Sequence, residues 1–155
     1  MISYTTIAIP TDVAEQVRLT GKDPRYGHPT HTELAKGYGP CRHCLKTFVV
    51  GEESRTLFTY DSFSGVETIP LPGPIFIHTE QCTRYPEQAG YPQDLRAYSA
   101  ILTAYATGQV FIERRYADKG EHDQAIEQLL ENPLVDYIEV RDKSAGCYDF
   151  RIERT

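Results

Sequence analysis

Alternating apolar and polar positions near the C-terminus predict a β-hairpin. Residues 135–141 and 147–153 both alternate, and the turn lies in the Asp-Lys-Ser-Ala-Gly segment at 142–146. Counting by two assigns the side chains of the second strand to two faces. One face carries Tyr148, Phe150 and Ile152. The other carries Cys147, Asp149, Arg151 and Glu153.

The same reasoning predicts further strands and two helices. The strands are expected at residues 3–9, 56–60, 75–77, 96–106 and 110–116, the last two joined as a hairpin by Thr107-Gly108-Gln109. One helix begins at Pro10-Thr11 and ends before Gly21, which suits a C-cap. The other spans 123–131, with an apolar stripe and a stop at Asn132-Pro133.

A long irregular stretch separates the first helix from the central strands. Residues 21–40 contain three Pro and four Gly, which punctuate against regular structure. The order of elements predicts an α+β fold: a single domain over residues 1–155, with a mainly antiparallel sheet of hairpins, two or three short helices and this long Gly/Pro-rich loop.

Composition and charge narrow the function classes. The 155 residues fit one domain, and the net charge of −6 argues against general nucleic-acid binding, which needs a basic face. The first ten residues do not resemble a secretory signal, and no apolar run is long enough to span a membrane. We therefore expect a cytoplasmic protein, whose cysteines stay reduced.

Two cysteine motifs carry the clearest chemistry. The first is Cys41-x2-Cys44, and the second is His78-x3-Cys82, each preceded by a Gly-Pro pair. Three thiolates and one imidazole form a closed tetrahedral zinc site, and Cys-x2-Cys has the spacing of a zinc knuckle. The sequence therefore predicts zinc bound by these four residues, with His43 as a rival ligand.

Two other interpretations of the cysteines stay open. Cys41 and Cys44 could form a redox-active dithiol, since Arg42 and His43 between them could lower a thiol pKa as in disulfide oxidoreductases. The context differs from that fold, in which the motif follows a strand and opens a long helix. The cysteines could also be ordinary buried residues without special chemistry.

Cys147 is the second place where a thiol enzyme could be centred. It begins a strand on the polar face, and Glu139 and Arg141 across the hairpin share the parity of that face. If the face is covered by the long loop, these residues form the wall of a polar pocket. If it is bare, they form a solvated ladder of ion pairs.

The long loop suggests a site for an anionic ligand. Between Lys22 and Lys46 there are five Lys and Arg against two Asp and Glu, a net charge of +3 in an acidic chain. This predicts a pocket between the loop and the sheet, lined by Tyr26, Tyr38 and Arg42. The alternative is a solvated loop without function.

The remaining histidines have simpler interpretations. His28 and His31 could form a second metal pair, although histidines in a Pro-rich loop are more often exposed to solvent. His122 lies beside the start of a predicted helix and is expected at the surface.

Several motifs together resemble one protein family. They are Gly-Pro-Cys41-Arg42-His43-Cys44-Leu45, Gly51-Glu52, Gly73-Pro74-Ile75-Phe76-Ile77-His78 with Cys82, Arg96-Ala97-Tyr98, Arg141, Ala145-Gly146-Cys147-Tyr148 and Arg154. In order and spacing they are similar to the bacterial domain of unknown function numbered 1203. The resemblance spans nearly the whole chain and implies a small bacterial protein, but it implies no reaction.

Two function classes follow. The first is a zinc-stabilised binding module for a small anionic ligand or a protein partner, with Tyr26, Tyr38, Arg42, Arg141 and Cys147 as candidate ligand-binding residues. The second is a thiol-dependent enzyme, either a Cys41–Cys44 dithiol oxidoreductase or a catalyst centred on Cys147. The first is favoured, because a closed metal set is plausible and no complete catalytic constellation is evident.

Overall fold

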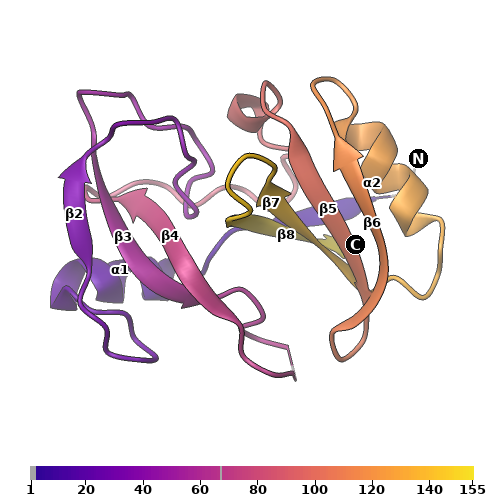
Figure 1. The fold of residues 1–155 in the computed structure, drawn as a ribbon, viewed down its shortest axis with the longest axis horizontal. Helices are drawn as coiled ribbons and strands as arrows, with labels where there is room; N and C mark the ends of the chain where they lie inside the picture. Colours follow the sequence, from indigo (N-terminus) through magenta and orange to yellow (C-terminus); the bar gives the residue numbers. More distant parts are fainter. Residues whose placement is uncertain (1–2, 67) are drawn as a thin grey trace.

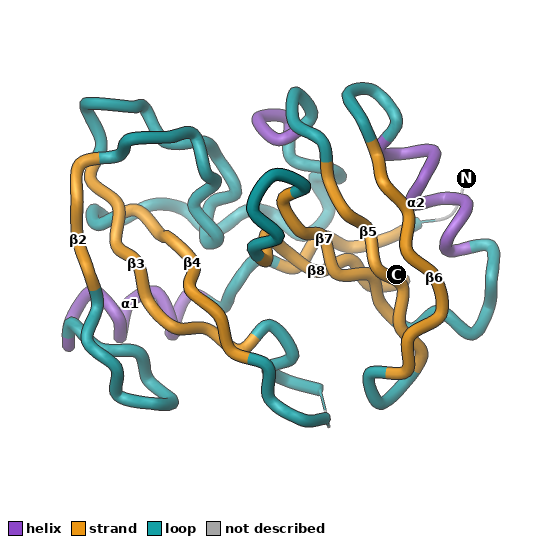
Figure 2. The backbone as a smooth tube through the Cα atoms, in the orientation of Figure 1, coloured by secondary structure: helices purple, strands orange, loops and turns teal. Residues whose placement is uncertain are grey.

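Two antiparallel sheets lie side by side in the protein (Figure 1). A computed structural model describes residues 3–66 and 68–155. The larger sheet has five strands in the order β1-β8-β7-β5-β6, and the smaller has three in the order β2-β3-β4. Loops make up much of the chain between them (Figure 2). The predicted α+β class with mainly antiparallel pairing is confirmed for this part of the chain.

The five-stranded sheet is assembled from both ends of the chain. Its strands are β1 (Tyr4–Ile7), β5 (Ala100–Ala106), β6 (Val110–Ala117), β7 (Tyr137–Asp142) and β8 (Tyr148–Arg154). The hairpins β5–β6 and β7–β8 correspond to the predicted hairpins, and β5 also pairs with β7. β-Branched and aromatic side chains in these segments prevail over the helix preference of the alanines in β5.

The three-stranded sheet contains one strand that the sequence pattern did not predict. Its strands are β2 (His31–Leu34), β3 (Ser54–Asp61) and β4 (Pro72–His78). β2 lies inside the stretch that was predicted to be irregular throughout. It is mostly exposed and has no clear apolar alternation, and it is held by its pairing with β3. Such tertiary pairing leaves little trace in a single sequence.

Two α-helices cover the sheets, α1 (Thr11–Thr20) and α2 (His122–Leu130), and a short 3-10 helix η1 (Gln93–Leu95) connects loops. α1 ends as predicted at Gly21, whose φ of 66° is the left-handed conformation that glycine adopts without strain. The prediction that His122 lies at the surface is wrong. His122 is fully buried, its ring stacks near Tyr91, and its Nε2 donates to the carbonyl of Tyr98.

Each sheet has its own apolar core. Phe150, Ile152 and Leu102 of the larger sheet pack against α2, while Phe58 and Ile77 of the smaller sheet pack against α1. The segment containing Cys41 and Cys44 lies at the boundary. Both cysteines belong to the core of the smaller sheet, and Leu45, immediately after them, belongs to the core of the larger one.

A β-bulge changes the predicted faces of β8. The register shifts between Val140 and Arg141, so that Arg141 pairs with Tyr148 and Val140 pairs with Phe150. Asp149 is the extra residue. Tyr148 therefore does not share a face with Phe150: it packs in the core of the smaller sheet, 5.9 Å from the Tyr60 ring. Simple counting by two fails where one residue is inserted.

Within the described residues, no helix has the length and apolar character needed to cross a membrane.

Candidate metal centre

The chain makes a tight turn at Cys41–Cys44. The Leu45 amide donates to the Cys41 carbonyl at 2.8 Å, and the Cys41 amide donates to the carbonyl of Lys46 at 3.0 Å. Leu45 has a φ of 59°, a conformation that a residue with a Cβ adopts only under local constraint. The turn holds the two thiols close together and is anchored by the buried Leu45 side chain.

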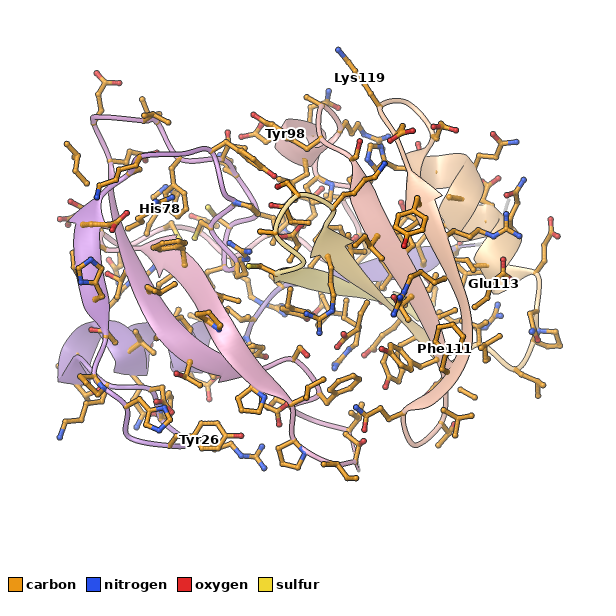
Figure 3. The ribbon with its side chains drawn as sticks, viewed as in Figure 1. Tyr26, His78, Tyr98, Phe111, Glu113 and Lys119 are labelled. Carbon is orange, nitrogen blue, oxygen red and sulfur yellow. The ribbon has the colours of Figure 1, made fainter. Side chains whose placement is uncertain are left out.

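The end of β4 brings the second motif to this turn. His78 is the last residue of β4, where it pairs with Arg55 of β3, and its amide donates to Cys41 Sγ at 3.3 Å. The chain then bends at Thr79–Glu80 and returns Cys82 to the same place. His78 is labelled in Figure 3 near the end of its strand.

The structure brings together the four predicted ligands. One donor atom from each of Cys41, Cys44, His78 and Cys82 lies within 4.8 Å of all the others. Cys41 Sγ is 3.8 Å from Cys82 Sγ, and Cys44 Sγ is 3.4 Å from His78 Nδ1. Cys41, Cys44 and His78 are buried, and Cys82 is partly exposed. This cluster could hold a metal ion.

A carboxylate supports the imidazole from behind. His78 Nε2 is 3.1 Å from Glu53 Oε2, while its Nδ1 faces the thiols. Metal-binding histidines in general have such a partner, which fixes the orientation of the ring and makes its nitrogen more basic. Glu53 itself is fixed by the Val49 amide, which donates to Oε1 at 2.7 Å. Glu53 could not be identified from the sequence, because nothing in its position marks it as a neighbour of His78.

Cys82 is surrounded by nitrogen donors. Arg18 Nη2 lies 3.3 Å and His43 Nδ1 lies 3.1 Å from its sulfur. His43 Nε2 is 3.0 Å from Thr11 Oγ1. When the Thr11 hydroxyl donates to Nε2, the ring proton is on Nδ1, which donates to the Cys82 sulfur. His43 thus contacts a proposed ligand and is not itself in the cluster of four. Arg18 and Thr11 come from α1, whose role here the sequence did not reveal.

These contacts shift the pKa values of Cys82 and Cys44 in opposite directions. Hydrogen bonds from Cys41, Cys44 and His43 hold the pKa of the Cys82 thiol far below its usual range. Hydrogen bonds with Cys41 and Cys82, together with burial, raise the pKa of Cys44. The hydrogen bonds of His78 with Cys41 and Cys82 raise the pKa of its imidazole to about 10. In the protein alone Cys82 therefore ionises more readily than Cys44, and thiolate is the form that binds metals.

The family comparison agrees with the sequence motifs. The model of the family described as "Protein of unknown function (DUF1203)" matches residues 38–154. The chain belongs to this family. No curated protein and no solved structure matches the chain significantly. The matched region contains all four residues of the cluster, Glu53 and Cys147, whereas Arg18 and Tyr26 precede it.

The other predicted ligand-binding residues are not gathered in one place. Tyr26 lines a hollow with Tyr60 of β3, and Tyr38 lines another, where its ring stacks on Tyr98 at 3.7 Å. Tyr26 and Tyr98 lie on opposite sides of the molecule in Figure 3. The side chain of Arg42 is buried, so it does not face a ligand at the surface. These placements do not support a single pocket lined by Tyr26, Tyr38 and Arg42.

Arg42 instead joins the cysteine turn to the larger sheet. Its Nη2 is 3.2 Å from Asp149 Oδ1, and its Nε and Nη1 donate to the carbonyls of Tyr148 and Pro40, each at 2.7 Å. Burial raises the pKa of Asp149 to about 7, against the opposing effect of Arg42. The positive charge of Arg42 is thus paired inside the protein.

Arg141 and Cys147 do line one cavity. It also includes Tyr60 and Tyr148, and the polar face of β7 and β8 lies beside it. Glu139 on that face is fully buried, so the solvated ladder of ion pairs is wrong and the covered alternative holds. The cover comes from residues 62–64, which follow β3, and not from the long loop.

His28 and His31 in the long loop do not come together as ligands of one metal site. His28 is exposed and contacts Thr59 and Asp23, while His31 is exposed and contacts Glu33. The prediction that they are exposed is confirmed.

Proposed function

We propose that the protein binds one zinc ion through Cys41, Cys44, His78 and Cys82. The observation that carries the proposal is the separation of their donor atoms. Zinc–sulfur and zinc–nitrogen bonds of about 2.3 and 2.1 Å give tetrahedral edges of about 3.8 Å between sulfurs and about 3.6 Å between sulfur and nitrogen. The 3.8 Å between Cys41 and Cys82 and the 3.4 Å between Cys44 and His78 fit those edges.

The zinc would have a structural role. Four protein ligands complete the tetrahedron and leave no position for water or substrate, which is the arrangement of structural rather than catalytic sites. The ligands come from the cysteine turn, the end of β4 and the segment after it, and Arg18 ties α1 to the same place. The ion would therefore tie together three segments that lie far apart in the sequence.

On this basis we propose a cytoplasmic binding module, whose partner is a small anionic ligand or another protein. A structural ion that orders loops suits a protein whose function lies on those loops. The alternative is a thiol-dependent enzyme. Its dithiol form has weak support, because the Cys41 and Cys44 side chains are buried and a protein substrate would have to reach them. Its Cys147 form is compatible with the partial exposure of that thiol.

Chelation tests the proposal. Structural zinc can supply on the order of 10 kcal/mol of folding free energy, so removal of the ion should unfold the protein or lower its melting temperature strongly. The melting of protein purified without affinity-tag metal is compared with and without a strong chelator, and zinc is then restored. Reversible loss and recovery of the cooperative transition is expected. An unchanged transition in metal-free protein contradicts the proposal.

A further inference from the structure

A cavity of about 500 Å³ is lined by residues of both sheets, at the β3–β4 hairpin and the turn between β7 and β8. Its volume is in the usual range of small-molecule sites. Two groups of side chains characterise its wall: the tyrosines Tyr60, Tyr105 and Tyr148, and the reactive or charged residues Arg114, Arg141 and Cys147.

The wall of the cavity is positively charged. Among the described residues it contains two arginines and no carboxylate. Arg141 is held in place by the Glu139 carboxylate at 2.9 Å, by Ser62 Oγ at 3.1 Å and by the carbonyl of Gly146 at 3.2 Å. Its guanidinium is therefore fixed before any ligand arrives, which reduces the entropy lost on binding.

Arg114 is the unbalanced cation. Its Nε donates to Thr103 Oγ1 at 3.5 Å, and its guanidinium lies 5.8 Å from the ring centre of Phe111. Among residues 3–66 and 68–155, no carboxylate lies within ion-pair distance of it. Glu139 offsets the charge of Arg141, so Arg114 supplies the net positive charge.

A buried polar atom lies beneath this wall. Glu139 is fully buried, and its Oε2 has no hydrogen-bond partner among the described residues. Burial, together with the charge of Glu139, raises the pKa of Tyr60, Tyr105 and Tyr148, which line the cavity. Burial raises the pKa of Glu139. Unsatisfied buried polar atoms are uncommon, and because a carboxylate oxygen accepts, the group that completes its hydrogen bonding is a donor such as a water molecule.

We infer that this cavity binds a small organic carboxylate with a flat apolar body, its negative group paired with Arg114 and Arg141. A single negative charge matches the one unbalanced cation, and arginine pairs with carboxylates through two parallel hydrogen bonds. The apolar body lies against Tyr60 and Tyr105, with Leu71 at the wall. The inference rests on the proposed binding function and gives that function a place and a ligand class, away from Tyr26 and Tyr38.

Cys147 provides a direct probe, because it lines the cavity and is partly exposed. The zinc-loaded protein is alkylated with anionic iodoacetate and, separately, with neutral iodoacetamide, and modification of the Cys147 peptide is followed by mass spectrometry. The ratio of the two rates is compared with that of an uncharged small thiol, N-acetylcysteine amide. An attraction of about 1 kcal/mol between opposite charges near 4 Å in water corresponds to a roughly fivefold higher ratio at Cys147.

Adjacent arginines on β6 supply a matched pair of variants. Arg114 pairs across the sheet with Thr103 on the cavity side, whereas Arg115 pairs with Leu102 and contacts Gln128 of α2. Arg114→Gln should bring the ratio to that of the uncharged thiol, and Arg115→Gln, with the same loss of charge, should leave it near the wild-type value. A wild-type ratio equal to that of the uncharged thiol overturns the inference without any variant.

Competition identifies the ligand class. Benzoate at millimolar concentration should slow the modification of Cys147 by iodoacetamide at least twofold, and inorganic phosphate should not. Protection by phosphate alone, or by neither compound, overturns the assignment of an organic carboxylate. The zinc proposal is judged separately by metal content: zinc without anion preference removes only the cavity inference, and anion preference in a protein that binds no zinc removes only the metal site.

Discussion

Glu53 should control the affinity of the cluster for zinc without binding the ion. Its Oε2 is 3.1 Å from His78 Nε2, and the other imidazole nitrogen faces the thiols. Glu53→Gln keeps the size of the side chain and an oxygen for the Val49 amide, but removes the negative charge behind the ring. The loss of such partners typically lowers metal affinity about 10–100-fold, or about 1.4–2.7 kcal/mol.

The assay is competition for zinc against a chromophoric chelator of known affinity. Glu52→Gln is the matched control, since Glu52 is the exposed neighbour of Glu53 and has the same charge. We expect Glu53→Gln to release zinc at a lower chelator concentration and Glu52→Gln to behave as wild type. Equal zinc affinity in all three proteins would refute the assigned role of the Glu53–His78 pair.

Three further substitutions test other parts of the structure. Cys147→Ser should leave zinc content intact and change the free energy of unfolding by no more than about 0.5 kcal/mol, as measured by elemental analysis and denaturant unfolding; loss of zinc would mean that Cys147 is a ligand. Arg42→Met should cost about 3–5 kcal/mol by leaving Asp149 buried and unpaired, and Arg42→Met with Asp149→Leu should recover part of that loss; additive losses would exclude the pairing. Phe150→Ala should cost about 3–5 kcal/mol in denaturant unfolding, because the ring is fully buried in the core beneath α2, and a loss under 1 kcal/mol would contradict that packing.

Much of the fold was readable from periodicity. The two long hairpins and both α-helices follow from alternation, from an apolar stripe and from residues such as Gly21 that end a helix. β2 was not readable, since four mostly exposed residues gain their conformation from pairing with β3. The bulge at Asp149 was not readable either. One extra residue there reverses the side on which Tyr148 lies.

The metal cluster was predictable in composition but not in environment. Ligand type and the short spacings within each motif indicated Cys41, Cys44, His78 and Cys82. The partners that orient them, Glu53 and Arg18, come from segments whose closeness depends on the whole fold. The positive charge of the long loop did not indicate where a pocket lies, because Arg42 is paired with Asp149 inside the protein.

The zinc content of four cysteine variants decides whether Cys41, Cys44 and Cys82 bind the ion. Each of Cys41, Cys44, Cys82 and Cys147 is replaced by serine, and the purified proteins, prepared without chelator or affinity-tag metal, are analysed for metal per chain. Serine is a poor zinc ligand, because its hydroxyl stays protonated near neutral pH. We expect about one zinc per chain in the wild type and in Cys147→Ser, and a strong loss of zinc in the other three variants. Full zinc content in Cys41→Ser, Cys44→Ser or Cys82→Ser, or none in the wild type, would contradict it.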